Sequence, residues 1–287
     1  MPKIRAAFAL SVFLLSSLIT IPWQTFCLTF KAFGYKSFPN WYQRQLAHLF
    51  GIRMHVTGTP IQDRGVLMVA NHTSYFDILA IGGAAKLSFV AKAEVANWPL
   101  FGRFAKLQRT IFVNRERKSA TGDVRDIIRD RLLEGDALML FPEGTSNDGN
   151  FVLPFKSALM GAAEVTVGHD PNGEPIYPPV QPVSVAYTKV HGLPMGRENR
   201  PLYAWYGDMD LVPHLWEAEV TGPIDVAIHF HPPLYVNQVG GRKALALLAE
   251  QIIRRGQADL LAGRAPSDDL PELALPRRPV LAAEAAA

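Results

Sequence analysis

The chain has 287 residues, of which 48% are hydrophobic and 19% charged, and its formal net charge is +3. The hydrophobic content excludes a disordered chain, and the single cysteine, Cys27, excludes a disulfide scaffold. A polytopic transporter is also excluded, because such a protein needs several long apolar runs. The length is compatible with one or two domains.

The net charge is an average over two unlike halves. Residues 1–118 carry 15 Lys and Arg against 4 Asp and Glu, whereas residues 119–287 carry 14 against 22. A basic amino-terminal half next to an apolar segment indicates contact with an anionic membrane surface, or with a phosphorylated substrate held there. Nucleic acid is the rival partner, but the chain has no recognition motif and no dense Lys/Arg run, so we expect no nucleic-acid partner.

The amino-terminal segment is the most apolar part of the chain and has no charged residue in 6–30. Pro22 is expected to break or kink a helix here, which leaves the 16 residues from Ala6 to Ile21. At ~1.5 Å per residue they span about 24 Å, which is marginal for a bilayer core of ~30 Å. Three interpretations are open: a cleaved signal peptide, a buried core helix, or a retained anchor that spans the bilayer or dips into one leaflet. The residues after Pro22 are bulky, which disfavours a cleavage site. We therefore favour the anchor. Residues 31–50 mix aromatic with cationic side chains, which is typical of the headgroup interface and also of a helix packed on the next domain.

The remainder of the chain alternates strand and helix patterns. Short apolar runs bounded by turn residues predict strands at 66–70, 87–91, 110–113, 137–141, 183–187 and 224–230. Helical periodicity predicts helices within 119–136, 155–167 and 243–255. The sequence therefore predicts an α/β fold, with a largely parallel or mixed sheet and helices on both faces, preceded by a membrane-associated helical segment. The predicted divisions are an anchor and interfacial helix (1–50), an α/β domain (51–263) and a loose carboxyl-terminal tail (264–287).

Two of the predicted strands end in polar clusters, and strand ends are where open α/β sheets build their sites. After strand 66–70, His72 and Asp77 stand five residues apart. A carboxylate in the first turn of the next helix reaches the imidazole, fixes its tautomer and leaves the other nitrogen free as a base. Ser74 lies between them, but the chain has no G-x-S-x-G motif, so we expect the base to activate a substrate hydroxyl directly. The alternative is that Asp77 caps the helix and His72 is a turn residue.

The second cluster follows strand 137–141 and reads Pro-Glu-Gly-Thr-Ser. Gly144 permits a tight turn, while Thr145 and Ser146 offer hydroxyls and amides to an anion. Glu143 adds a carboxylate able to hold a polyol hydroxyl. The alternative is a plain turn without a function.

Two further histidines, His229 and His231, stand two residues apart at the end of the strand predicted at 224–230. Side chains at this spacing in an extended chain lie on the same face. The chain has one cysteine and no helical H-x-x-x-H pair. We therefore interpret these residues as structural histidines and predict no metal site.

Together, the clusters resemble the 1-acylglycerol-3-phosphate O-acyltransferase (lysophosphatidic acid acyltransferase) family of glycerolipid acyltransferases. The family motif N-H-x-x-x-x-D is matched in full by Asn71, His72 and Asp77. Its F-P-E-G-T-R block is matched by residues 141–146, except that Ser146 replaces the arginine.

Two weaker blocks complete the resemblance. The G-x-I-F-I-x-R block is matched by RTIFVNR, in which Arg109 replaces the glycine and Arg115 matches the final arginine. A proline in an apolar strand, Pro182, is the fourth block. The four blocks occur in the family order over residues 46–187.

The resemblance implies transfer of a fatty acyl group from an acyl-carrier-protein or coenzyme A thioester to a lysolipid hydroxyl, with no other cofactor. It implies His72 as the base, Asp77 as the group that orients it, and Glu143, Gly144 and Thr145 as contacts to the acceptor. Arg115 is the implied phosphate-pairing cation, and Lys92 is an additional cationic candidate.

The main expectation is 1-acyl-glycerol-3-phosphate as acceptor and phosphatidic acid as product. Because Ser146 removes a bidentate phosphate contact, the alternative is a phosphate-free acceptor such as a lyso-ornithine lipid. A hydrolase or transacylase using the same pair, and a lipid-binding protein with a dead site, are the other hypotheses. A cytosolic thioester implies a membrane location with the site on the cytoplasmic face, at the inner membrane in a bacterium.

Overall fold

A mixed eight-stranded sheet lies at the centre of the computed structural model, which describes residues 1–114 and 120–269. The strands are β1 (Ile52–Gly58), β2 (Val66–Ala70), β3 (Ser88–Lys92), β4 (Ile111–Val113), β5 (Ala137–Leu140), β8 (Val180–Val190), β9 (Leu193–Pro194) and β10 (Ile224–Phe230). Their order is β1-β10-β8-β2-β5-β3-β4, with β9 beside β8. A separate hairpin pairs β6 (Gly168–His169) with β7 (Pro175–Ile176).

The core of the sheet is parallel. β4, β3, β5, β2 and β8 run the same way, so the carboxyl ends of β2, β3 and β5 meet at one edge. β10 runs antiparallel to β8 and parallel to β1. The predicted polar clusters after β2 and β5 therefore lie on neighbouring strand ends.

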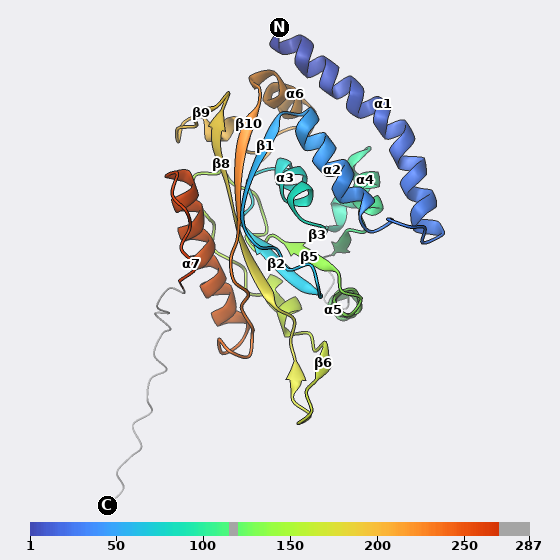
Figure 1. The fold of residues 1–287 in the computed structure, drawn as a ribbon, viewed down its shortest axis with the longest axis vertical. Coiled ribbons are helices and arrows are strands. Elements are labelled where there is room, and N and C mark those ends of the chain that lie inside the picture. Colours follow the sequence, from blue (N-terminus) through green and yellow to red (C-terminus); the bar gives the residue numbers. More distant parts are fainter. Residues whose placement is uncertain (115–119, 270–287) are drawn as a thin grey trace, which may run out of the picture.

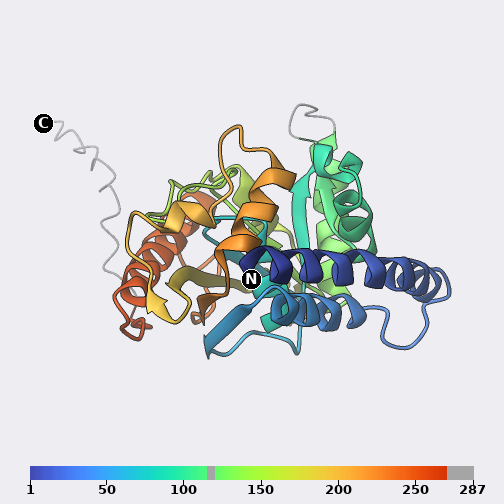
Figure 2. The same cartoon turned by 90° about the horizontal axis from the view of Figure 1, so that it is seen from above.

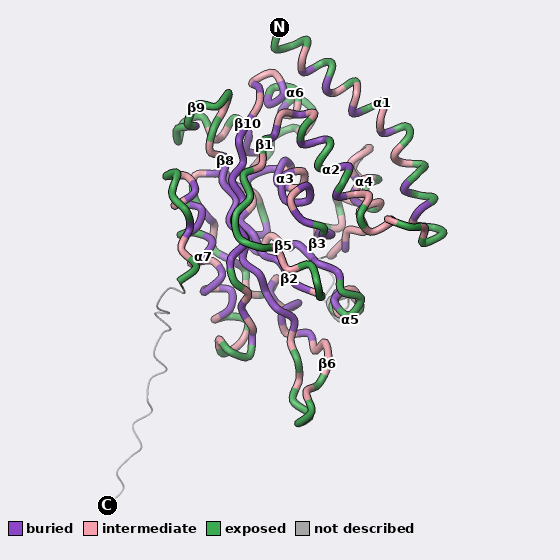
Figure 3. Tube along the Cα trace, viewed as in Figure 1, coloured by how far each residue is buried: buried purple, intermediate pink, exposed green. Residues whose placement is uncertain are grey.

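Helices cover both faces of the sheet, as predicted (Figure 1). They are α1 (Pro2–Thr29), α2 (Phe38–Leu49), α3 (Phe76–Ala84), α4 (Phe101–Leu107), α5 (Ala120–Leu133), α6 (Leu211–Thr221) and α7 (Arg242–Leu261), with short 3-10 helices at Ala93–Asn97, Leu159–Glu164 and Arg200–Leu202. Side chains of β2 divide between two cores: Val66, Met68 and Ala70 join the core with α2 and α3, while Leu67 and Val69 join the core with α5 and α7. β2, β5 and β10 are buried along their whole length, whereas the outer side of α1 and most of the β6–β7 hairpin are exposed (Figure 3).

The sequence predicts a break or a kink at Pro22, and the amino-terminal helix is not broken there. α1 continues to Thr29 and is long and apolar enough, by length and composition, to cross a membrane. It lies along the domain and packs on α2, α4 and α6 (Figure 2). Ser17 and Gln24, on either side of Pro22, are buried, and Gln24 Nε2 donates to the carbonyls of Tyr35 and Leu107 at 2.8 and 3.2 Å. These contacts offset the ~3 kcal/mol that an internal proline costs a helix.

The six predicted strands are present, whereas two other features differ from prediction. β1 was not predicted because it is a largely exposed edge strand without an apolar run. The helix predicted at 155–167 is a loop with one short 3-10 turn, because its backbone bonds elsewhere: Phe155 N–H donates to Glu250 and Lys156 N–H to the Pro142 carbonyl. The division into 1–50, 51–263 and 264–287 stays a prediction.

Candidate active site

The turn between β2 and α3 is fixed to the neighbouring strand by Asn71. The β2–β8 ladder ends at the pair Ala70–Val183, and the Asn71 side chain then takes over the pairing. Its Nδ2 donates to the Val185 carbonyl and its Oδ1 accepts from Val185 N–H, both at 2.9 Å. The amide thus positions the turn that carries His72.

His72 and Asp77 form the predicted pair. His72 Nδ1 lies 2.8 Å from Asp77 Oδ2, with the imidazole 21% exposed and the carboxylate fully buried. The same Oδ2 accepts from the N–H groups of Thr73 (2.8 Å) and Ser74 (3.1 Å). An ionised carboxylate only accepts hydrogen bonds, so His72 carries its proton on Nδ1 and keeps a lone pair on Nε2. The geometry therefore suits a general base.

The second oxygen of Asp77 is held by Tyr187, a residue on β8 that sequence reasoning missed. The Tyr187 hydroxyl donates to Asp77 Oδ1 at 2.7 Å, and both side chains are buried. Burial, followed by the charge of Asp77, raises the pKa of Tyr187 well above its usual value, so the phenol stays protonated as a donor. A tyrosine among the valines of an apolar strand was the available signal, since a buried hydroxyl needs a partner.

Glu143 holds the backbone of His72 by a hydrogen bond. Its Oε1 accepts from His72 N–H at 2.8 Å, and its Oε2 accepts from Asn147 Nδ2 at 2.8 Å and Leu153 N–H at 3.0 Å. Burial raises the pKa of Glu143 to about 7, against the lowering effect of these hydrogen bonds. Its carboxylate is thus engaged with the protein; a direct contact with the acceptor stays a prediction.

The rest of the second block packs around the imidazole. The ring of Phe141 stacks on His72 with centroids 4.0 Å apart. Gly144 has φ +75°, a left-handed conformation that favours glycine and closes the turn. Thr145 is exposed, whereas Ser146 is half-buried and its hydroxyl donates to the Trp205 carbonyl. The structure thus brings both predicted clusters together.

Of the two predicted cations, Lys92 and Arg115, the structure describes Lys92. Lys92 is exposed at the end of β3, at the same sheet edge but two strands from β2. Arg115 falls outside the described residues.

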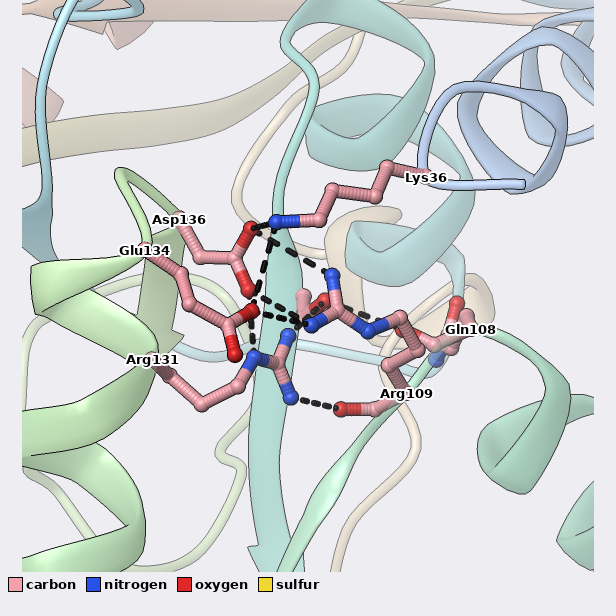
Figure 4. A network of polar contacts seen from close by, with 7 residues as sticks. Lys36, Gln108, Arg109, Arg131, Glu134 and Asp136 are labelled. Carbon is pink, nitrogen blue, oxygen red and sulfur yellow. Dashed lines mark hydrogen bonds and ion pairs between the residues drawn. The ribbon is translucent and has the colours of Figure 1, made fainter. Parts of the chain in front are cut away.

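Arg109, which replaces the glycine of the second block, belongs to an ion network at the opposite ends of the strands. There the Asp136 carboxylate lies between Lys36 (3.0 Å), Arg109 (3.0 Å) and Arg131 (Figure 4). Burial raises the pKa of Asp136, but hydrogen bonds from Arg131 and Lys36 outweigh it and lower the pKa overall. The network is structural, because it lies just before β5 whereas the His72 turn follows the other end of β2.

An apolar cavity of about 150 Å³ lies between α1, α2, α3, α4 and α6. Tyr75 and Phe76, directly after the His72 turn, form part of its wall, and Leu211 and Leu215 of α6 form another part. The Tyr75 hydroxyl pairs with His214 Nδ1 at 2.8 Å. The apolar cavity thus shares Tyr75 and Phe76 with the chain segment that follows His72.

Comparisons with known proteins identify the chain as an acyltransferase. The Acyltransferase family model matches residues 53–186. The lyso-ornithine lipid O-acyltransferase of Brucella abortus is 43% identical over 261 residues, covering 91% of this chain and 97% of the relative. The chain belongs to this family of lipid acyltransferases, which also includes the 1-acylglycerol-3-phosphate acyltransferases.

Two further comparisons are with 1-acylglycerol-3-phosphate acyltransferases. The 1-acyl-sn-glycerol-3-phosphate acyltransferase of Neisseria gonorrhoeae is 30% identical over 200 residues, covering 70% of this chain and 72% of the relative. The crystal structure of the 1-acyl-sn-glycerophosphate acyltransferase from Thermotoga maritima shares the fold, with a TM-score of 0.63, 24% identity, and coverage of 91% of this chain and 98% of that one. This protein is therefore an acyltransferase enzyme, with a lysolipid acceptor and an acyl thioester donor.

Proposed function

We propose that the protein transfers a fatty acyl group from a thioester to the free hydroxyl of a lyso-ornithine lipid. The observation that carries this proposal is its 43% identity, over nearly the full length of both chains, to a lyso-ornithine lipid O-acyltransferase. Ser146 supports it, because the position where the phosphate-binding relatives are expected to carry arginine holds a hydroxyl that bonds to Trp205. The comparisons thus favour the alternative acceptor over the 1-acyl-glycerol-3-phosphate of the main expectation.

The chemistry follows from the orientation of His72. Nε2 takes the proton of the acceptor hydroxyl as its oxygen attacks the thioester carbonyl carbon. The carbon–sulfur bond then breaks, and the thiolate receives the same proton from the imidazolium. Asp77 stabilises the imidazolium while it exists. General base catalysis of this kind, by His72, typically contributes roughly 10²–10⁴-fold.

The apolar cavity and the outer surface of α1 fit a lipid reaction. A space of about 150 Å³ beside Tyr75 accommodates part of an acyl chain. α1 buries one stripe against the domain and exposes large apolar side chains on the other: Phe8, Leu15, Leu18, Ile19, Trp23 and Phe26. We infer that this exposed surface enters the membrane, with the site on the cytoplasmic side, where acyl-carrier protein and coenzyme A are found.

Purified enzyme tests the proposal when it is offered lyso-ornithine lipid or 1-acyl-glycerol-3-phosphate separately, with each thioester donor. Free thiol and acylated lipid are measured together. We expect a higher kcat/KM with lyso-ornithine lipid, and no product from His72→Ala although this variant still binds vesicles. Acylation of the phosphate acceptor alone would refute the proposed acceptor, and free fatty acid as the product would indicate a hydrolase.

Ser146→Arg tests why the acceptor is chosen. Restoring the family arginine adds a guanidinium suited to bidentate phosphate binding. We expect the ratio of kcat/KM values to move toward 1-acyl-glycerol-3-phosphate by roughly tenfold or more, since a charged hydrogen bond contributes ~1.5–3 kcal/mol. An unchanged ratio would show that position 146 does not select the headgroup.

A further inference from the structure

Three potential metal ligands meet on the side of the sheet opposite the active site. His229 ends β10 together with Phe230, His231 follows it, and Asp268 lies beyond α7. One ligand atom from each residue falls within 4.8 Å of the others: His Nδ1 or Nε2 and a carboxylate oxygen. His229 Nε2 and His231 Nδ1 lie 3.1 and 3.6 Å from Asp268 Oδ1. These separations are close to the ~3.3 Å between ligands of a tetrahedral ion with bonds of ~2.0–2.1 Å.

Hydrogen bonds hold one nitrogen of each imidazole toward this point: His229 Nε2 is within hydrogen-bond distance of Asp268 Oδ1, and the partners of His231 leave a lone pair on its Nδ1. Ser184 on β8 has one hydroxyl hydrogen, which it donates to the Ile253 carbonyl at 3.2 Å. Its oxygen therefore accepts from His231 Nε2, 2.8 Å away, and His231 Nδ1 carries a lone pair. On the other side, the Thr57 hydroxyl lies 2.8 Å from His229 Nδ1, which leaves Nε2 to face Asp268. Outer-shell partners of this kind hold metal-binding histidines in position.

His231 is poorly satisfied without a cation. Its side chain is 1% exposed, and Nδ1 has no hydrogen-bond partner among the described residues. A buried lone pair then faces a carboxylate, an arrangement that a divalent cation between them would stabilise.

Gly256 of α7 leaves space for the side chains of Ser184 and His231. A Cβ atom at Gly256 of α7 would lie 2.3 Å from Ser184 Oγ and 2.7 Å from His231 Nε2, so a side chain there would displace both groups. The ligand side opens instead into a groove lined by His231, Asp268 and Asp63. The groove admits water or a further ligand to complete the coordination shell.

We propose that His229, His231 and Asp268 bind one zinc ion, which ties the segment after α7 to the sheet. Two imidazoles and one carboxylate are a donor set that suits Zn²⁺. This inference differs from the expectation that the chain has no metal site, and it concerns residues 262–268 of the segment that follows α7. The site is separate from catalysis, because Ser184 faces α7 whereas Tyr187 faces Asp77 on the other side of β8.

Zinc binding to tag-free, chelator-stripped enzyme tests the proposal by calorimetry and native mass spectrometry, with Zn²⁺ alone as the probe. We expect one equivalent to bind, and Co²⁺ in its place to give visible d–d absorption typical of low coordination. Asp268→Asn and His229→Ala should abolish this binding, and Ser184→Ala should weaken it roughly 10–100-fold. Asp269→Asn, a neighbouring exposed carboxylate, is the matched control and should bind like wild type.

Other results would contradict the proposed zinc site. Failure of wild type to bind one equivalent, or wild-type affinity in Asp268→Asn, overturns the proposal. His231→Ala removes a fully buried ring; should it not fold, His229→Ala and Asp268→Asn decide the matter. Acyl transfer in zinc-free Asp268→Asn should equal that of wild type, so loss of zinc binding and loss of acyltransferase activity are distinguishable.

Discussion

Tyr187→Phe removes the hydroxyl that holds Asp77, the residue paired with His72, and leaves every other group in place. In the wild type this hydroxyl donates to Asp77 Oδ1 at 2.7 Å, while His72 and two backbone N–H groups share Oδ2. Without it, Oδ1 has lost a charge-assisted hydrogen bond inside the core. The carboxylate is then free to rotate away from the line that orients His72.

The expected cost follows from the burial of both partners. A hydrogen bond to a charged group contributes ~1.5–3 kcal/mol, and we expect the free energy of unfolding to fall by about this amount. Where about half of it is expressed in the transition state, kcat falls roughly 4- to 13-fold, since 1.36 kcal/mol corresponds to one order of magnitude. KM for the acceptor should change little, because Tyr187 is buried behind Asp77.

The assay compares kcat, KM and urea unfolding of Tyr187→Phe with those of Tyr203→Phe. Tyr203 is equally buried, but its hydroxyl donates to the Gly222 carbonyl at 2.8 Å, away from the base. Tyr203→Phe should lose about 1 kcal/mol of stability and keep its kcat. In a double-mutant cycle, Asp77→Asn should make the effect of Tyr187→Phe on kcat small.

A Tyr187→Phe enzyme that loses stability but keeps wild-type kcat would refute the reasoning. Tyr187 would then be a packing residue, and the orientation of His72 would rest on the backbone N–H groups alone.

Further predictions concern the ion network, the amino-terminal helix and the membrane. Asp136→Asn leaves three cations without their shared carboxylate, so urea unfolding should show a loss of about 3 kcal/mol with kcat unchanged; unchanged stability would contradict the network's role. Burial, opposed by Arg5, raises the pKa of Glu219 to about 7, so wild-type stability is lost as pH rises from the unfolded pKa near 4.5 through the folded value. Glu219→Gln should equal wild type near pH 4.5 and exceed it by up to roughly 3 kcal/mol above pH 7 in unfolding experiments; an equal difference at both pH values would exclude this cause. Leu18→Asp should weaken sedimentation with anionic vesicles, whereas Leu193→Asp, equally exposed but on β9, should not; equal effects would place the membrane contact elsewhere.

The central strands and the His72–Asp77 pair could be predicted from the sequence, because each depends on residues that are close together in the chain. The runs at 66–70 and 137–140 are continuous apolar strands, and their polar ends meet because the strands are parallel and adjacent. His72 and Asp77 are close in the chain, so their pairing follows from one strand-to-helix turn.

The parts that escaped prediction depend on contacts between distant segments. Tyr187 reaches Asp77 across 110 residues, through the register of β2 on β8. Glu143 accepts from His72 N–H only because β5 lies beside β2. Pro22 stays inside a helix because tertiary packing on both sides of it outweighs a local propensity.

We propose that His72 acts as the base when a phosphate-free lysolipid attacks an acyl thioester. The most direct test of this claim is a competition in which equal amounts of lyso-ornithine lipid and 1-acyl-glycerol-3-phosphate share one vesicle and one labelled acyl thioester. We predict that the labelled product is mainly the acylated ornithine lipid, and that His72→Ala gives neither product. Phosphatidic acid as the main product, or labelled lipid formed by His72→Ala, would contradict the claim.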